Sequence, residues 1–279
     1  TPPTGGTCSG FTCTCPTGMV LCGGSCVMGT GTCTAGVGAC ARTGTSDCSA
    51  ISTGVLFPGA GESFSCAVMV DRTARCWGLN GNGQLGNGTT TSSAAPVTVT
   101  GLTNAAQVIG GGLHACATVN GNVRCWGYNG YGQLGDNTVT QRTTPVTVLT
   151  TGALTALTNV EQLSATYYST CARRSDGTVW CWGYNGNGEL GDGTTANRAT
   201  ATQVPNLFNV VAISSGWNHT CAIRSNGTVW CWGYNGYGQL GDGGTATQLL
   251  PVPVTALGGA TASIAASGYT TCVHISDNT

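Results

Sequence analysis

The residues in this chain whose type and spacing allow chemistry are its 17 cysteines, among 279 residues. Cysteine thiols pair as disulfides, bind zinc or act as nucleophiles. Eight of them recur as pairs nine or ten residues apart, with Trp-Gly after the second member: Cys66 and Cys76, Cys116 and Cys125, Cys171 and Cys181, Cys221 and Cys231. This spacing favours disulfides, and paired cysteines do not act as nucleophiles.

The last pair shows the geometry that we expect for all four. Residues 219–224 are predicted as a strand, 225–228 as a turn and 229–232 as the return strand. Such a hairpin places Cys221 opposite Cys231, and Cα atoms in a non-hydrogen-bonded antiparallel pair lie about 4.5 Å apart, within disulfide range. Disulfides persist in oxidising compartments, so we expect an extracellular or cell-surface protein.

The first 50 residues carry eight further cysteines and show no periodic apolar face. We predict that residues 1–50 form a small module held together by disulfides, whose connectivity the spacing leaves open. Zinc is the alternative, because ligand-like spacings occur, but this region contains no histidine. The eight cysteines are Cys8, Cys13, Cys15, Cys22, Cys26, Cys33, Cys40 and Cys48.

The remaining cysteine, Cys272, has no partner at the repeated spacing. That partner would fall at roughly position 282, beyond the last residue, 279. Two interpretations are open: the chain is a fragment, or a neighbouring subunit supplies the missing strands. In the second case Cys272 is a candidate for an intermolecular disulfide, and strand addition at the open edge would build a polymer.

The cysteine pairs belong to a tandem repeat. Cys-Trp-Gly occurs at 76–78, 125–127, 181–183 and 231–233, at intervals of 49, 56 and 50 residues. A period of about 50 residues with several short strands is typical of a β-propeller. We therefore predict an all-β fold in which residues 51–279 form four complete four-stranded blades and part of a fifth, after the module at 1–50. Trp77, Trp126, Trp182 and Trp232 are predicted to lie in the blade cores.

Two phrases of the repeat identify a family. Residues 213–220 and 233–241 resemble the regulator of chromosome condensation repeat, and the resemblance covers about residues 55–279. It implies a β-propeller, commonly with seven blades. The family's nuclear member is an exchange factor for a small GTPase and binds chromatin, roles that disulfides and the absence of lysine argue against here.

The chain departs from the family at one strand position, which is hydrophobic in the family and cysteine in every unit here. The departure implies a secreted version held by disulfides. The first 50 residues are similar to Cys-rich segments on secreted bacterial proteins, a resemblance that points the same way.

Composition excludes several classes of function. Charged residues make up 7% of the chain, and the net charge is −1. No basic face is therefore available for nucleic acid, and no run of about 18 apolar residues is present to span a membrane. The phrase Gly-x-Gly-x-x-Gly occurs four times, but no helical pattern follows it, so we interpret it as a structural turn rather than a nucleotide site. Neither converging carboxylates nor a nucleophile elbow is evident, so we expect no enzyme, cofactor or metal.

Aromatic residues at predicted loops are the candidates for recognition, because Tyr and Trp on rigid loops make contact surface at low entropic cost. They are Trp217, Tyr131, Tyr237 and Tyr167. Three sequons make Asn87, Asn218 and Asn226 candidate glycosylation sites. His114 and His219 share one repeat position, where we expect a hydrogen bond between neighbouring strands rather than a zinc ligand.

These observations together predict a non-enzymatic secreted or cell-surface propeller that binds a protein or a glycan through its loops. The alternative is a structural subunit of an extracellular fibre or surface layer. In that alternative the partner is a neighbouring copy, which completes the open blade.

Overall fold

The computed structural model of this chain describes residues 55–276 and, before them, the backbone of six short strands. The chain divides into two compact units, Thr1–Leu56 and Phe57–Thr279, so the division falls beyond the expected boundary at residue 50. The first unit contains the antiparallel hairpins β1 (Thr7–Ser9) with β2 (Thr12–Thr14), β3 (Met19–Cys22) with β4 (Ser25–Met28), and β5 (Thr32–Cys33) with β6 (Cys40–Ala41). The predicted disulfides of residues 1–50 lie outside the described residues.

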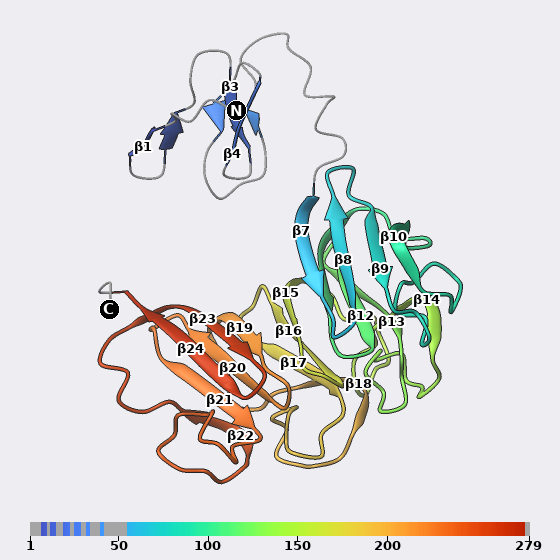
Figure 1. Cartoon of the computed structure of the whole chain (residues 1–279). Helices are drawn as coiled ribbons and strands as arrows, with labels where there is room; N and C mark the ends of the chain where they lie inside the picture. Colours follow the sequence, from blue (N-terminus) through green and yellow to red (C-terminus); the bar gives the residue numbers. More distant parts are fainter. Residues whose placement is uncertain are drawn as a thin grey trace. The chain divides into compact units, whose positions relative to one another are not determined.

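The second unit contains four four-stranded antiparallel sheets followed by a two-stranded hairpin (Figure 1). Consecutive strands are neighbours in every sheet, which is the arrangement of propeller blades and confirms the predicted fold. The first blade comprises β7 (Val55–Ala60), β8 (Phe64–Met69), β9 (Ala74–Gly78) and β10 (Ser93–Thr98). The second comprises β11 (Ala105–Gly110), β12 (His114–Val119), β13 (Asn122–Gly127) and β14 (Arg142–Thr147).

The later blades repeat this order. The third comprises β15 (Val160–Ala165), β16 (Ser169–Arg174), β17 (Val179–Gly183) and β18 (Arg198–Gln203). The fourth comprises β19 (Val210–Ser215), β20 (His219–Arg224), β21 (Val229–Gly233) and β22 (Gln248–Pro253). The partial fifth is the hairpin of β23 (Thr261–Ser267) and β24 (Thr270–Ile275). No helix long and apolar enough to cross a membrane occurs in the described part of the chain.

Each complete blade is crossed by one disulfide between its two middle strands. Cys221 lies opposite Cys231 in register, and the other blades repeat this pairing. The Cα–Cα distances are 4.0 Å for Cys66–Cys76 and 4.1 Å for Cys116–Cys125, Cys171–Cys181 and Cys221–Cys231. All four predicted disulfides are confirmed, and their sulfurs are buried in the blade cores.

Neighbouring blades are joined along their inner strands, because β11, β15, β19 and β23 contact one another in succession. Glutamine side chains extend this contact by mimicking a strand. The Gln107 amide of β11 accepts from the Leu163 N–H at 2.8 Å and donates to the Leu163 carbonyl at 3.2 Å. Gln162 makes the same pair of hydrogen bonds to Ile213. The inner strands therefore hold adjacent blades in a fixed register.

Tryptophan fills the space between blades. The indoles of Trp126, Trp182 and Trp232 are fully buried, as predicted. Each donates its Nε1–H to a carbonyl of the preceding blade, for example Trp182 to Gln133 at 2.9 Å. Trp77 differs from the prediction, because it is only partly buried. No complete blade precedes it among the described residues, so nothing there covers its outer face.

Candidate functional site

The second unit has two ends, and the loops at one of them carry the aromatic candidates. Because the strands alternate in direction, two sets of loops emerge at the same end of every blade. One set joins the first strand to the second, as at 111–113 and 166–168, and the other joins the third to the fourth, as at 128–141 and 184–197. We call this end the loop face. Turns such as 225–228 and the connections between blades form the opposite end.

A first aromatic cluster joins the second and third blades on the loop face. The ring centroids of Tyr131 and Tyr168 lie 5.1 Å apart, and those of Tyr167 and Tyr168 lie 4.5 Å apart. Tyr131 also contacts Tyr184, at 5.1 Å. The predicted recognition residues Tyr131 and Tyr167 are thus brought into one cluster by Tyr168. We define the first cluster as Tyr128, Tyr131, Tyr167, Tyr168 and Tyr184.

A second aromatic cluster joins the fourth blade to β23 and β24. Trp217 and Tyr237 both contact Tyr269, with ring centroids 5.3 Å and 5.2 Å away. Tyr234 completes the cluster. Trp217 is 52% exposed and Tyr237 is 72% exposed, so these two predicted residues present most of the accessible ring area.

Five members of the two clusters were not predicted from the sequence. Three of them directly follow Cys-Trp-Gly, and a tyrosine repeated at one position was a signal available for them: Tyr128, Tyr184 and Tyr234. The other two, Tyr168 and Tyr269, share a position three residues before a repeat cysteine. That position holds Asn218 in the fourth blade, so it gives a weaker signal.

A buried asparagine shapes each long loop that presents these rings. In the second blade the Asn129 side chain accepts from the Leu134 N–H at 2.9 Å and donates to the carbonyls of Thr138 and Thr140 at 3.1 Å and 3.0 Å. The Tyr131 N–H donates to the Gln133 side chain at 2.9 Å. The loop is therefore fixed from within by the Gly-x-Gly-x-x-Gly turn, in agreement with its structural interpretation.

A pocket of about 440 Å³ lies on the loop face, where the short loops of the four complete blades and of the partial fifth meet. Its walls include Tyr167 from the first cluster and Trp217 from the second. The loop backbones form a chain across it, because the Gly112 N–H donates to the Tyr167 carbonyl at 2.9 Å and the Tyr167 N–H to the Trp217 carbonyl at 3.2 Å. The pocket therefore connects the two aromatic clusters.

One side chain bridges this pocket. The Tyr167 hydroxyl donates a hydrogen bond to the Glu62 carboxylate, which belongs to the first blade. This bond to a carboxylate raises the pKa of Tyr167 to about 12. The bridge passes over Gly112, where a Cβ atom would lie 2.6 Å from two carbons of the Tyr167 ring. A residue without a side chain is therefore required beneath the ring.

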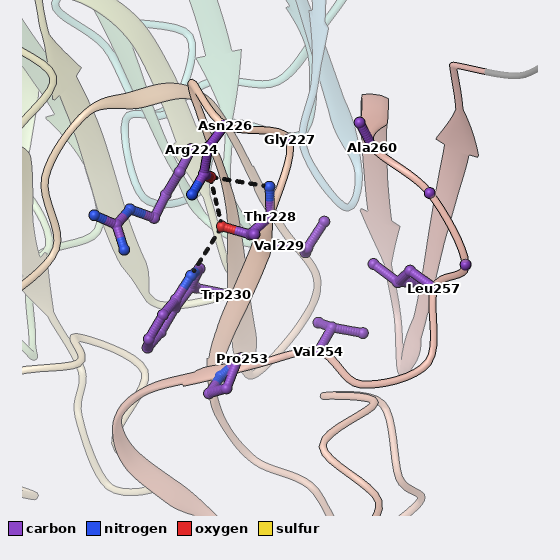
Figure 2. A pocket seen from close by; sticks show the side chains of 12 residues that line it. Arg224, Asn226, Gly227, Thr228, Val229, Trp230, Pro253, Val254, Leu257 and Ala260 are labelled. Atoms are coloured by element: carbon purple, nitrogen blue, oxygen red, sulfur yellow. Dashed lines mark hydrogen bonds between the residues drawn. The ribbon is translucent and has the colours of Figure 1, made fainter.

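A second pocket, of about 470 Å³, lies at the opposite end beside β21 and β22 (Figure 2). The Thr228 hydroxyl donates to Asn226 at 2.7 Å and accepts from the Trp230 indole at 3.3 Å. The Arg224 guanidinium lies 5.6 Å from the Trp230 ring centroid, within cation–π range. These contacts fix the polar wall of the pocket, in which Arg224 is the charged residue.

The candidate glycosylation sites occupy different environments. Asn226 caps an exposed turn on the wall of the second pocket. Asn87 accepts from the Thr89 hydroxyl at 2.8 Å in an exposed part of a long loop. Asn218 donates to Glu189 at 3.1 Å, and Thr220 of its sequon is buried. Glycosylation of all three stays a prediction.

The two predicted histidine contacts are present, and both cross between blades. His114 Nε2 lies 2.8 Å from Thr170 Oγ1, and His219 Nε2 lies 2.8 Å from Thr271 Oγ1. No cluster of three or more His, Cys, Asp or Glu side chains suited to a metal ion occurs among residues that the structure describes. Cys272 is exposed on β24 and unpaired within residues 55–276.

Charge is separated between the two ends of the second unit. The loop-face half carries five acids and two arginines, a formal charge of −3: Glu62, Asp136, Glu189, Asp192 and Asp242, with Arg142 and Arg198. Among the residues that the structure describes, the half nearer the opposite end carries three acids and six arginines, a formal charge of +3: Asp71, Glu161 and Asp176, with Arg72, Arg75, Arg124, Arg173, Arg174 and Arg224. The near-neutral sequence therefore folds into a polar unit with an acidic aromatic end.

Family models match the sequence of the second unit. The regulator of chromosome condensation (RCC1) repeat matches residues 76–118, 120–173, 176–223 and 226–274. A second model of the same repeat matches residues 59–84, 160–189 and 210–239. The matched residues make up more than half of the chain.

Solved structures show the same fold. Human WBSCR16 matches with a TM-score of 0.68 and 24% identity, over 83% of this chain and 59% of that one. Prp20p from Saccharomyces cerevisiae matches with a TM-score of 0.65 and 17% identity, over 76% of this chain and 53% of that one. Yeast RCC1 (Prp20) bound to Kap60 matches with a TM-score of 0.66 and 17% identity, over 77% and 52%. The chain thus spans little more than half the length of these proteins.

Proposed function

Because this chain belongs to the regulator of chromosome condensation (RCC1) repeat family, we propose that it is a non-enzymatic binding module that takes a protein or a glycan on its loop face. The observation that carries the proposal is the pair of aromatic clusters joined at one pocket. Rings held by rigid loops lose little entropy on binding, so they supply contact area efficiently.

Three of the loop-face acids make structural contacts. Asp136 and Asp192 pair with Arg142 and Arg198 at 2.8 Å and 2.7 Å. Asp242 accepts from Gln248 at 2.9 Å in the corresponding place. Such contacts fix the long loops, which supports a role in presenting a surface.

A location outside the cytoplasm is part of the proposal. It is supported by the four buried disulfides, because reducing conditions would keep these thiols apart. A protein ligand is supported by the fold relatives, since yeast Prp20p is described with binding properties toward Gsp1p and histones, and yeast RCC1 with Kap60. A glycan remains the other ligand to be tested.

The test is binding of the purified chain to arrays of extracellular proteins and of glycans, with three variants in parallel. Trp217→Ala and Tyr237→Ala each remove an exposed ring of the second cluster. Phe208→Ala is the matched control, because Phe208 is 48% exposed at the opposite end. We expect the first two variants to lose the ligand and Phe208→Ala to retain it. Equal binding by all three variants would contradict the proposal.

A second candidate role is assembly with neighbouring copies. In the described residues the outer edge of β24 has no strand beside it, and Cys272 is exposed where the complete blades have a disulfide. The last repeated turn differs from the others in the same region. A Cβ at Gly86, Gly135 or Gly191 would touch an indole, whereas at Gly241 it would touch only Val254.

Electron microscopy and non-reducing electrophoresis test this second role. Filaments, together with disulfide-linked oligomers that disappear in Cys272→Ser, are the expected result. Single particles and a monomeric band in the unreduced wild-type chain would rule it out.

A further inference from the structure

The loop-face pocket is rich in hydrogen-bond acceptors and poor in donors. Seven of the backbone N–H groups that line it already donate to carbonyl groups of the protein. They are those of Gly61, Gly111, Gly112, Thr166, Tyr167, Gly216 and Trp217. An anion entering the pocket would therefore meet no free backbone donor from these residues, and an anion site needs such donors.

The side chains of the pocket favour positive charge. Glu62 is the only ionisable acid in the lining, and no arginine lines it. One Glu62 oxygen accepts from Tyr167, and the other has no partner among the described residues. Tyr167 and Trp217 add aromatic rings, whose faces attract cations.

The surroundings of the pocket act in the same direction. The loop-face half carries the formal charge of −3 described above, and the arginines nearest the loop face are each paired with an aspartate. A cationic ligand would be drawn toward this end and held away from the opposite end, which carries +3. This separation of charge favours a positively charged ligand in the pocket.

From these observations we propose that the loop-face pocket binds a lysine or arginine side chain of a protein ligand. Glu62 is the counter-ion, and Tyr167 and Trp217 provide the rings that pack against the cation. The inference rests on the proposed function, because it names the chemical group that the binding face takes. A neutral glycan would need exposed rings but no counter-ion, so finding that the loop face binds one would oppose this inference.

The probes are blocked pentapeptides with arginine, lysine, citrulline or glutamate at the centre of a glycine background. Citrulline keeps the shape of arginine without its charge. Binding to the full chain is followed by tryptophan fluorescence and by calorimetry, at low and at physiological salt. We expect binding in the order arginine, then lysine, with citrulline weaker by about fivefold or more and glutamate inactive. Affinity should fall as salt rises, because the pocket is open to solvent.

Glu62→Gln keeps the size of the side chain and removes its charge. We expect this substitution to lower the affinity for the arginine peptide by about five- to tenfold. Glu161→Gln is the matched control, because Glu161 is an exposed acid that pairs with Arg173 in the half nearer the opposite end. It should bind like the wild-type chain. Melting curves of both variants establish that they remain folded.

The outcomes separate this inference from the function on which it rests. Equal binding of the arginine and citrulline peptides, or an unchanged affinity in Glu62→Gln, would overturn the cation site. If an array ligand is still lost in Trp217→Ala in that case, the binding face stands without it. If the Trp217→Ala and Tyr237→Ala variants also bind the array ligand as well as the wild-type chain does, the proposed function fails too.

Discussion

His114 of the second blade and Thr170 of the third are joined by a buried hydrogen bond of 2.8 Å between Nε2 and Oγ1. The Nδ1 atom of His114 has no partner among the described residues. Gly111 lies against the imidazole, since a Cβ there would be 2.2 Å from its Cε1. His219 and Thr271 repeat the contact between the fourth blade and the fifth. The two contacts make blade packing dependent on neutral histidine.

This dependence predicts a loss of stability in acid. Burial lowers the pKa of His114 and of His219 from 6.5 to about 4. The unfolded chain therefore binds these protons first, so stability falls as pH decreases from 6.5 toward 4 and levels off below that for these groups. Each pKa unit corresponds to ~1.4 kcal/mol, so His114 alone accounts for about 3 kcal/mol.

Denaturant titrations between neutral pH and pH 4 measure this effect. His114→Gln should reduce the slope of stability against pH. A slope that is the same in His114→Gln as in the wild-type chain would show that the inter-blade histidine does not control it.

The hairpin disulfides should carry a measurable part of the stability. The Cys171–Cys181 bond closes a loop with a sequence separation of 10, for which chain entropy gives about 3 kcal/mol. We expect the double variant Cys171→Ala, Cys181→Ala to melt well below the wild-type chain in thermal scans by circular dichroism. Cys272→Ser is the control, because Cys272 is exposed and pairs with no described cysteine. Similar melting of all three proteins would contradict the prediction.

Replacing an inter-blade tryptophan should cost more stability than replacing Trp77 of the first blade. Trp182→Phe leaves a cavity and removes the donor to the Gln133 carbonyl, so we expect a loss of about 2 to 4 kcal/mol. Trp77→Phe should cost much less, because Trp77 is only partly buried. The two free energies of unfolding, measured in urea, test this ranking, and an equal or reversed order would be evidence against Trp182 as the bridge between blades.

The bridge from Tyr167 to Glu62 should depend on Gly112. Gly112→Ala would place a methyl group against the Tyr167 ring and separate the hydroxyl from the carboxylate. The pKa of Tyr167, raised to about 12 in the intact protein, should then fall toward its ordinary value of 10.0. Spectrophotometric titration of the tyrosines, compared with Tyr167→Phe, follows the change. Gly81→Ala is the control, because a Cβ at Gly81 meets no atom within 4 Å. If the titration of Tyr167 is unaltered in Gly112→Ala, the bridge does not need Gly112.

The blades and their disulfides could be predicted from the repeat alone. Cys221 and Cys231 lie in one hairpin, so alternation along two short strands was enough to place them opposite each other. The loop positions of Trp217 and Tyr237 followed from the repeat in the same way. These features are local, and a period of about 50 residues copies them from blade to blade. The hydrogen bonds of His114 and His219 were expected from their shared repeat position, but their partners, Thr170 and Thr271, lie in the next blade.

Which loops meet depends on the packing of the blades and could not be predicted from the repeat. Tyr131 and Tyr184 lie on successive blades, and Tyr167 reaches Glu62 from 105 positions away in the chain. The separation of charge between the two ends and the partial exposure of Trp77 are of the same kind. Each depends on how neighbouring sheets pack and on which end of a strand a residue occupies, and this packing brings together side chains that no short stretch of sequence relates.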